Sequence, residues 1–147
     1  MNQQHFIFVF GTLKEGFPNF PTNRGSRLAG DFQTVERFPL YLIGERMSPW
    51  MIATPGQGER VQGQVFAVSD TELADMDALE RTHEPDGYRR LQIAVVANDD
   101  AEQRHFITFA YLKPVEQFDA AMIKKGPLSV YALSDAQLYL PRISAGT

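Results

Sequence analysis

The stretch HFIFVF at residues 5–10, followed at once by GTLK at residues 11–14, decides the fold of this chain. The first six residues are mostly aromatic or β-branched and show no polar alternation, which predicts a strand buried on both faces. Gly11 ends this strand, and the chain then turns into a loop that contains Pro18 and Pro21. The rest of the chain must therefore cover the strand from two sides.

Further β-type segments follow along the chain. Their β-branched and aromatic content, bounded by turn residues, predicts strands at residues 27–37, 39–43, 50–54, 61–68, 88–97 and 104–112. In the 88–97 segment, Leu91, Ile93 and Val95 fall at alternate positions and so share one face.

One helix is clearly marked. Ser69 and Glu72 have the spacing of a capping box, which satisfies free amides of the first helical turn. The helix is predicted to run from Asp70 to about His83, where the sequence EPDG at residues 84–87 ends it.

The C-terminal part carries weaker patterns. Prolines and glycines break residues 113–141 into short pieces, with one further helix predicted near residues 117–124. About seven strands with one or two helices predict an α+β domain with a curved or barrel-like sheet. The 147 residues are close to the ~150 of an ordinary domain, so residues 1–147 are interpreted as a single domain.

Composition and charge exclude several classes of protein. Apolar residues make up 44% and charged residues 22%, which is typical of a globular chain. The net charge of −4 argues against a nucleic-acid partner, because phosphate contacts need a clustered basic face. No segment has the ~18 apolar residues of a membrane span, and the N-terminus lacks the features of a signal peptide. We therefore expect no membrane partner and a cytoplasmic protein.

The absence of cysteine removes further kinds of chemistry. Without it there is no disulfide, thiolate zinc site, iron–sulfur cluster or cysteine nucleophile. The three histidines, His5, His83 and His105, lack the close spacing of zinc hydrolases. The serines lack the spacing of a nucleophile elbow. We expect no metal and no cofactor.

Glu80 is an unexpected carboxylate on the predicted helix. Leu73, Met76 and Leu79 define the helix face that packs on the core, and Glu80 falls within that arc. One interpretation is a slightly rolled helix, with Glu80 reaching solvent or pairing with an arginine at position 81, 89 or 90. The other is a general base whose pKa is raised by desolvation and by Asp77 at the edge of the same face.

The turn after the first strand is a second candidate site. Glycine at position 11 allows a close backbone approach to a ligand, and successive amides of such a turn can form an anion-binding nest. The alternative is a simple tight turn. The turn has neither the dinucleotide fingerprint nor the phosphate loop, so no nucleotide cofactor follows from it. Trp50, Tyr88 and Tyr111 are the aromatic candidates for lining a site.

Several uncommon motifs occur in one unbroken order between about residues 6 and 112. They are FVFGTLK at 8–14, FPL at 38–40, GE at 44–45, PW at 49–50, PGQG at 55–58, GQVFAV at 63–68, MDALE at 76–80 and YRR at 88–90. In these motifs the chain resembles the γ-glutamylcyclotransferase-like family, and most closely its γ-glutamylamine cyclotransferase branch.

The resemblance implies a fold, an activity and a site. The fold is a small mixed β-barrel of about six to seven strands with flanking helices and a pocket at the end of the first strand. The activity is cleavage of a γ-glutamyl amide by its own α-amine, which releases 5-oxoproline and a free amine without metal or cofactor. The catalytic glutamate falls on Glu80, and backbone groups of Phe10, Gly11, Thr12 and Leu13 bind the γ-glutamyl part of the substrate.

Two features depart from the family pattern. Phe10 stands where the family usually has tyrosine, and residues from Lys113 onward match poorly, in a part that shapes the leaving-group side of such folds. The alternatives are the same chemistry on γ-glutamyl amino acids or another γ-glutamyl metabolite, and a non-catalytic binding module on the same fold. The expected partner is a small γ-glutamyl molecule, and we expect a monomer or a weak dimer.

Overall fold

The computed structural model describes residues 3–141. Its strands are β1 (Gln4–Val9), β2 (Ser26–Arg27), β3 (Phe32–Phe38), β4 (Leu40–Ile43), β5 (Ser48–Met51), β6 (Glu59–Ser69), β7 (Arg89–Ala97), β8 (Phe106–Leu112) and β9 (Ile123–Lys125). Its α-helices are α1 (Asp70–Glu80) and α2 (Leu133–Ala136). No helix in residues 3–141 is long and apolar enough to span a bilayer.

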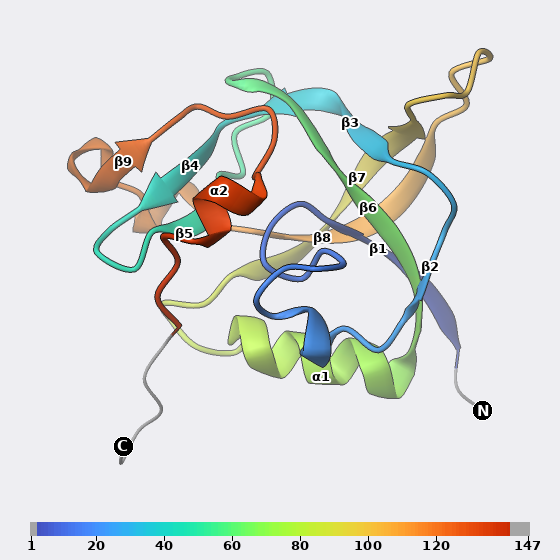
Figure 1. Cartoon of the computed structure of the whole chain (residues 1–147), viewed down its shortest axis with the longest axis horizontal. Coiled ribbons are helices and arrows are strands. Elements are labelled where there is room, and N and C mark those ends of the chain that lie inside the picture. Colours follow the sequence, from blue (N-terminus) through green and yellow to red (C-terminus); the bar gives the residue numbers. More distant parts are fainter. Residues whose placement is uncertain (1–2, 142–147) are drawn as a thin grey trace.

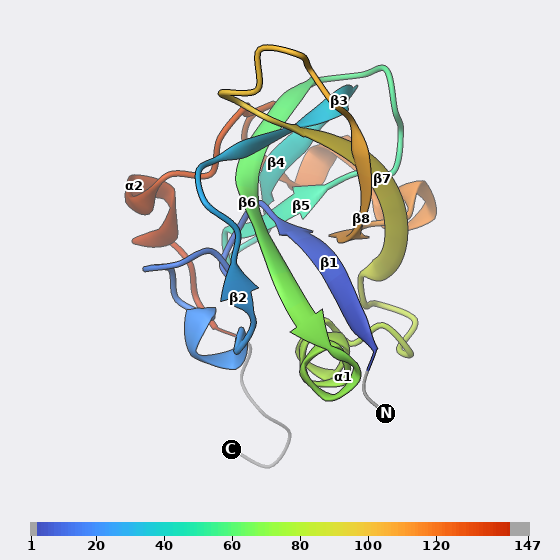
Figure 2. The same ribbon diagram turned by 90° about the vertical axis from the view of Figure 1, so that its right-hand side faces the viewer.

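The larger sheet curls into a closed barrel (Figure 2). Its strand order is β1-β8-β7-β3-β6-β2, and β6 also pairs with β1 and so closes the ring. The β1–β6 pair is antiparallel, with Phe8 opposite Val65, whereas the β1–β8 pair is parallel, with Ile7 opposite Phe109. The expectation of a small mixed β-barrel with flanking helices is confirmed.

Strand β1 is buried on both faces over residues 7–9, whereas Phe6, near its start, is 38% exposed, so the sequence prediction holds for the second half of the strand. Phe8 and Phe10 belong to one buried cluster together with Val65 of β6. Ile7 and Val9, at the alternate positions, belong to a second cluster that contains Leu73 and Met76 of α1. The strand therefore lies between two hydrophobic clusters, which explains why its sequence is apolar at nearly every position.

Helix α1 begins at its predicted cap and ends earlier than predicted. Ser69 Oγ accepts a hydrogen bond from the amide of Glu72, and Glu72 Oε1 accepts one from the amide of Ser69. The helix ends at Glu80 instead of His83, because Arg81 adopts the left-handed conformation with φ of 57° and ψ of 44°. The side chains from residue 81 onward therefore leave the helix axis and turn back toward β7.

The smaller sheet, with order β5-β4-β9, lies beside the barrel (Figure 1). It joins the barrel through a parallel bridge between Ile52 and Lys113, just beyond the ends of β5 and β8. The helix predicted at residues 117–124 is wrong. Phe118 is extended and stacks on Tyr41 at 5.4 Å, so the chain forms two separate 3-10 turns before it enters β9.

The segment predicted as one strand at residues 27–37 is two strands. Gly30 has a φ of 85°, outside the extended region, and the chain bends there between β2 and β3. The predicted face of the 88–97 segment is buried only in part. Ile93 and Val95 are in the core, but Leu91 is 40% exposed.

Candidate functional site

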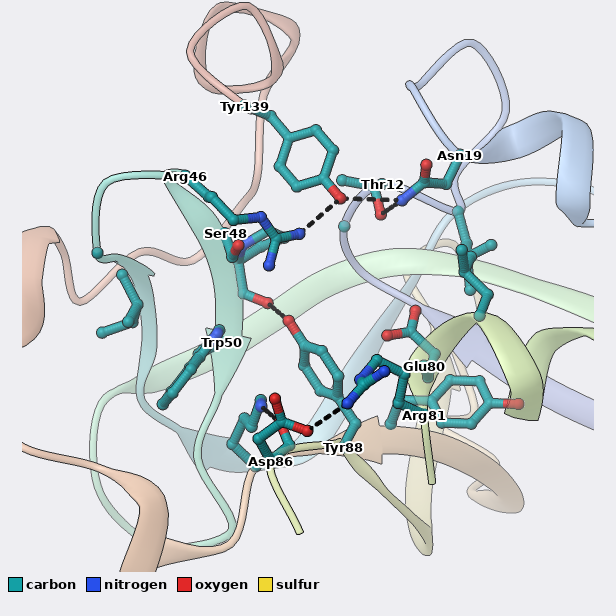
Figure 3. A pocket seen from close by; sticks show the side chains of 18 of the residues that line it. Thr12, Asn19, Arg46, Ser48, Trp50, Glu80, Arg81, Asp86, Tyr88 and Tyr139 are labelled. Atoms are coloured by element: carbon teal, nitrogen blue, oxygen red, sulfur yellow. Dashed lines mark hydrogen bonds and ion pairs between the residues drawn. The ribbon is translucent and has the colours of Figure 1, made fainter. Parts of the chain in front are cut away.

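A cleft of about 1310 Å³ opens beside the end of β1 (Figure 3). The turn after β1, the C-terminal end of α1, the β4–β5 hairpin and the C-terminal segment all contribute to its walls. Its lining residues include Phe10, Gly11, Thr12, Leu13, Asn19, Arg46, Pro49, Trp50, Glu80, Arg81, Asp86, Tyr88, Tyr111, Lys113 and Tyr139. The structure therefore brings both candidate sites of the sequence, Glu80 and the turn at residues 10–13, into one cleft.

The carbonyl groups of the turn are occupied by protein donors. The Gly11 carbonyl accepts from the amide of Lys14 at 3.1 Å, and the Thr12 carbonyl accepts from the amide of Asn19 at 2.8 Å. The Leu13 carbonyl accepts from the side-chain amide of Asn23 at 3.0 Å. These three bonds fix the peptide planes of the turn.

The amide N–H groups of the same turn differ from its carbonyls in their hydrogen bonding. The N–H groups of Gly11, Thr12 and Leu13 find no acceptor among residues 3–141, although all three residues are buried. An unpaired buried N–H is rare in native proteins, because it costs about 1–3 kcal/mol. The turn therefore presents a set of donors of the kind that binds an anion or a developing oxyanion.

Gly11 also permits a close contact between the turn and the smaller sheet. A Cβ atom added to Gly11 would lie 2.9 Å from Cγ of Pro49. The Pro49 carbonyl in turn accepts a hydrogen bond from the Tyr88 hydroxyl at 2.9 Å. Glycine at this position thus lets the turn, β5 and Tyr88 meet at one side of the cleft.

Glu80 is the last residue of α1, and the following loop fixes its position. Its carbonyl accepts from the amide of Tyr88 at 3.0 Å, which brings the loop back against the end of the helix. Gly87 is essential to this return, because a Cβ atom there would lie 1.7 Å from the Arg81 carbonyl oxygen. The Glu80 side chain is half-buried and lines the cleft.

The three arginines considered as partners of Glu80 have other partners. Arg81 pairs with Asp86 at 2.9 Å, and Arg90 pairs with Asp77. Arg89 donates to a series of main-chain carbonyls in the loop after α1. Each of these guanidinium groups thus has a hydrogen-bond partner in α1 or in the loop that follows it.

Asp77, the predicted neighbour of Glu80, is itself well compensated. Its carboxylate accepts from the Tyr111 hydroxyl at 2.7 Å as well as from Arg90. Burial raises the pKa of Tyr111, and the hydrogen bond to Asp77 and the charge of Glu80 raise it further. Tyr111 is therefore a neutral donor, and Asp77 has a cation and a phenol to balance its charge.

The three aromatic candidates all line the cleft. Trp50, Tyr88 and Tyr111 come from β5, the loop after α1 and β8. Burial raises the pKa of Tyr88 well above its usual value, and the charge of Glu80 raises it further. Tyr88 therefore stays protonated as the donor to the Pro49 carbonyl.

Lys113 is a cleft residue that the sequence gave no reason to select. It is 3% exposed, and its ammonium lies 4.3 Å from the Trp50 ring centre and 4.6 Å from that of Tyr88. Its Nζ also donates to the Asp86 carbonyl at 2.6 Å. Lys113 thus ties β8 to the loop after α1, a role that only the three-dimensional contacts reveal.

The C-terminal segment supplies a second group that sequence reasoning missed. Tyr139 lines the cleft and lies between Asn19 of the first loop and Arg46 of the β4–β5 hairpin. The family resemblance implies that this segment shapes the leaving-group side, but it does not indicate which residue does so. No periodic pattern marks Tyr139, since it lies in a stretch without regular structure.

The residues of the cleft offer no metal site. Within residues 3–141, no group of three or more histidine, aspartate or glutamate side chains is placed to hold a metal ion. The functional groups described above in the cleft are a carboxylate, backbone amides, and cationic and aromatic side chains.

Comparison with known proteins gives the class. A sequence model described as "Gamma-glutamyl cyclotransferase, AIG2-like" matches residues 7–129, and the chain belongs to this family. It is therefore an enzyme of the γ-glutamylcyclotransferase type. The family assignment agrees with the resemblance found in the sequence motifs.

Individual relatives share this relationship. Gamma-glutamylaminecyclotransferase of Homo sapiens is 36% identical over 99 residues, which are 64% of this chain and 63% of the human protein. Gamma-glutamylaminecyclotransferase B of Danio rerio is 33% identical over 113 residues, 73% of this chain and 58% of the fish protein. The matched segment thus spans about three fifths of each relative.

A solved structure confirms the fold over nearly the whole chain. The crystal structure of an AIG2-like protein from Mus musculus superposes with a TM-score of 0.80 and covers 99% of both chains at 24% sequence identity. The match establishes the architecture of the barrel and its flanking elements. The roles of Glu80 and of residues 10–13 stay predictions.

Proposed function

We propose that this chain cleaves a γ-glutamyl amine into 5-oxoproline and the free amine. The observation that carries the proposal is the placement of the Glu80 carboxylate in the same cleft as the unpaired amides of Gly11, Thr12 and Leu13. A carboxylate provides proton transfer, and the amides provide donors for negative charge. The family membership supports the reaction type.

The substrate supplies its own nucleophile in this reaction. The α-amine attacks the γ-carbonyl carbon, a C–N bond forms, and the ring of 5-oxoproline closes. Such an intramolecular attack gains its rate from orientation, so the protein needs no covalent nucleophile. It needs to hold the γ-glutamyl part folded on itself and to move one proton.

Glu80 is the proposed proton carrier. Its carboxylate accepts a proton from the attacking ammonium and then donates it to the departing nitrogen, as the bond between the γ-carbon and that nitrogen breaks. One carboxyl group thus serves as base and then as acid, and it ends the cycle in its starting state. The return of the loop at Tyr88 and Gly87 keeps Glu80 at a fixed place in the cleft.

The amides of the turn are the proposed donors for negative charge. They hold the α-carboxylate of the γ-glutamyl part or the oxyanion that develops on the γ-carbonyl oxygen. Because the carbonyls of Gly11 and Thr12 are already bonded, the peptide planes that carry the Thr12 and Leu13 amides need little rearrangement when the ligand arrives. Phe10 in place of tyrosine leaves this backbone recognition intact.

The test is a substrate panel with two products measured. The chain is incubated with γ-glutamyl amines, γ-glutamyl amino acids and glutathione, and 5-oxoproline and the released amine are quantified with and without a chelator. We expect equal amounts of the two products, unaffected by the chelator. Release of glutamate instead of 5-oxoproline contradicts the proposed reaction. No release from any member of the panel also contradicts it and favours a non-catalytic binding module.

A further inference from the structure

The loop after α1, residues 81–88, connects two groups of the cleft. It begins directly after Glu80 and ends at Tyr88, and both of these side chains line the cleft. Figure 3 shows the Glu80 carboxylate and the Tyr88 ring on the same part of the cleft wall, and the charge of Glu80 acts on the Tyr88 phenol. The conformation of this loop therefore determines how the carboxylate and the phenol are placed.

The loop is wrapped around the guanidinium of Arg89, the first residue of β7. Nη1 of Arg89 donates to four main-chain carbonyl oxygens, those of Glu84, Gly87 and Tyr88 at 3.1 Å and that of Thr82 at 3.4 Å. One NH2 group has only two hydrogens, so these bonds are shared between acceptors. A single side chain thus organises carbonyls from both ends of the loop.

Two further side chains complete this arrangement. Their acceptors are also main-chain carbonyls of the loop, that of Asp86 for Lys113 Nζ at 2.6 Å and those of Pro85 and Gly87 for Gln117 Nε2 at 2.9 Å. Six carbonyls between residues 82 and 88 therefore accept from side chains outside the loop, and Arg89 serves four of the six. Hydrogen bonds from a charged donor are stronger than those from a neutral one, which suits a point where several partly negative oxygens converge.

Arg89 acts on the cleft only through this loop. Among residues 3–141, the cleft is lined by Arg81 and Tyr88 but not by Arg89. The connection to the cleft is short, because the Tyr88 carbonyl accepts from Arg89 while the Tyr88 amide donates to the Glu80 carbonyl at 3.0 Å. The guanidinium thus holds the residue that closes the loop against the end of α1.

We propose that Arg89 is a positioning residue, which holds the loop at residues 81–88 so that the Glu80 carboxylate and the Tyr88 phenol keep their places. The inference rests on the proposed function, because that function assigns the proton to Glu80. Proton transfer requires the carboxylate within about 2.6–3.2 Å of the nitrogen. A displacement of about 1 Å can lower the rate by about 10²-fold. Loss of the guanidinium removes the donor of four carbonyls, so the loop has to rearrange to bring them to other donors or to water.

The test compares Arg89→Met with a matched control, Arg60→Met. Arg60 is also half-buried and donates to a main-chain carbonyl, that of Thr34 at 2.9 Å, but it is not among the described residues that line the cleft. In Arg89→Met we expect kcat on a γ-glutamyl amine to fall by about 10- to 100-fold. We expect KM to change by less than about threefold, because the amides of residues 11–13 remain in place. Arg60→Met is expected to keep both constants within about twofold of the natural chain.

A conservative variant and a measurement independent of turnover complete the design. Arg89→Lys keeps a cation with three donor hydrogens, and its kcat is expected to lie between those of the natural chain and Arg89→Met. Hydrogen exchange of the Tyr88 amide reports directly on the closure of the loop against Glu80. We expect this exchange to be faster in Arg89→Met and unchanged in Arg60→Met, while the amides of the β1–β6 pair keep their rates in both. If Arg89→Met does not fold, a lower kcat at unchanged KM in Arg89→Lys supports the inference, and a natural kcat overturns it.

The outcomes separate this inference from the proposed function. A kcat of Arg89→Met within about twofold of the natural value, or an unchanged exchange rate at Tyr88, overturns the inference while 5-oxoproline formation still stands. An equal fall of kcat in Arg60→Met assigns the effect to general stability and also overturns it. A rise of KM with kcat unchanged assigns Arg89 to substrate binding and overturns it as well. If the natural chain forms no 5-oxoproline, the proposed function itself has failed, and the role of Arg89 in placing Glu80 for proton transfer fails with it.

Discussion

The two sides of the cleft are built in different ways. One side, formed by the turn after β1 and by the end of α1, stands on elements that are buried on two faces or packed across the barrel. The other side, formed by the β4–β5 hairpin and the C-terminal segment, consists of turns and short pieces. Rigid elements suit a fixed proton carrier and fixed amides, whereas loops can vary to fit different leaving groups. The two candidate sites of the sequence therefore lie on the more regular part of the cleft wall, and Arg46 and Tyr139 lie on the part made of turns and short segments.

The largest expected effect is on the rigid side. Glu80→Gln keeps the size of the side chain but cannot accept the ammonium proton, so we expect kcat to fall by about 10²–10⁴-fold or more. Thermal stability is expected to stay equal or rise, because a half-buried charge is removed. Glu84→Gln, an exposed glutamate in the loop after α1, is the matched control. A Glu80→Gln enzyme with more than about a tenth of the natural kcat means that another residue carries the proton.

The next effect tests the contact between the two sides. In Gly11→Ala, the new Cβ atom lies 2.9 Å from Cγ of Pro49, so the turn or β5 has to move. We expect kcat/KM to fall by about tenfold, with an overpacking cost of about 1–3 kcal/mol in stability. Kinetics and urea denaturation of the same preparation measure both quantities. Full activity together with lost stability would show that the position of the turn amides does not matter for turnover.

A smaller effect concerns the pH dependence. If the negative charge of Asp77 disfavours ionisation of Glu80, Asp77→Asn lowers the apparent pKa of the ascending limb of the pH–rate profile. We expect a shift of less than about one unit, because Arg90 and Tyr111 already compensate the Asp77 carboxylate. If the apparent pKa of this limb is unchanged, desolvation alone acts on the ionisation of Glu80. If the apparent pKa rises, the proposed repulsion between the Asp77 and Glu80 carboxylates is contradicted. Asp75→Asn, an exposed aspartate of the same helix, is the control.

The smallest effect concerns the junction of the two regions. Lys14 follows the turn and is buried, and its ammonium donates to the Tyr131 carbonyl in the C-terminal segment and lies 4.2 Å from the Phe17 ring centre. Burial lowers the pKa of Lys14 from 10.5 to about 8. Between these values the folded chain has released a proton that the unfolded chain retains, so stability rises with pH in that window.

The measurement is urea denaturation at several pH values from 7.5 to 10.5, a window set by the lowered and ordinary pKa of Lys14. In the natural chain we expect the free energy of unfolding to rise with pH, with a slope that corresponds to the release of at most one proton on folding. We expect this rise to be absent in Lys14→Met. Lys124→Met, at an exposed position on β9, is expected to keep the slope. If the free energy of unfolding changes with pH in the same way in the natural chain and in Lys14→Met, Lys14 is not buried in its charged form.

The difference between the two sides also explains which features of the cleft could be predicted from the sequence. The apolar run at residues 5–10, the capping box at Ser69 and the inward position of Glu80 are local patterns, and each led to the right element or placement. Arg46 and Lys113 gave no such signal, because their place in the cleft depends on contacts with distant segments. The stacking of Phe118 on Tyr41, between the two 3-10 turns that stand in place of the predicted helix at residues 117–124, is likewise a contact with a distant segment.

The most direct test of the account is a titration of the ¹⁵N-labelled chain with 5-oxoproline, followed through its amide resonances. The account predicts saturable shifts that are largest at the N–H groups of Gly11, Thr12 and Leu13, since these buried donors gain their acceptor from the ligand. The Glu80→Gln variant is expected to show the same pattern of shifts while it has lost turnover. Saturable shifts confined to another part of the chain, with these three resonances unmoved, would contradict the account.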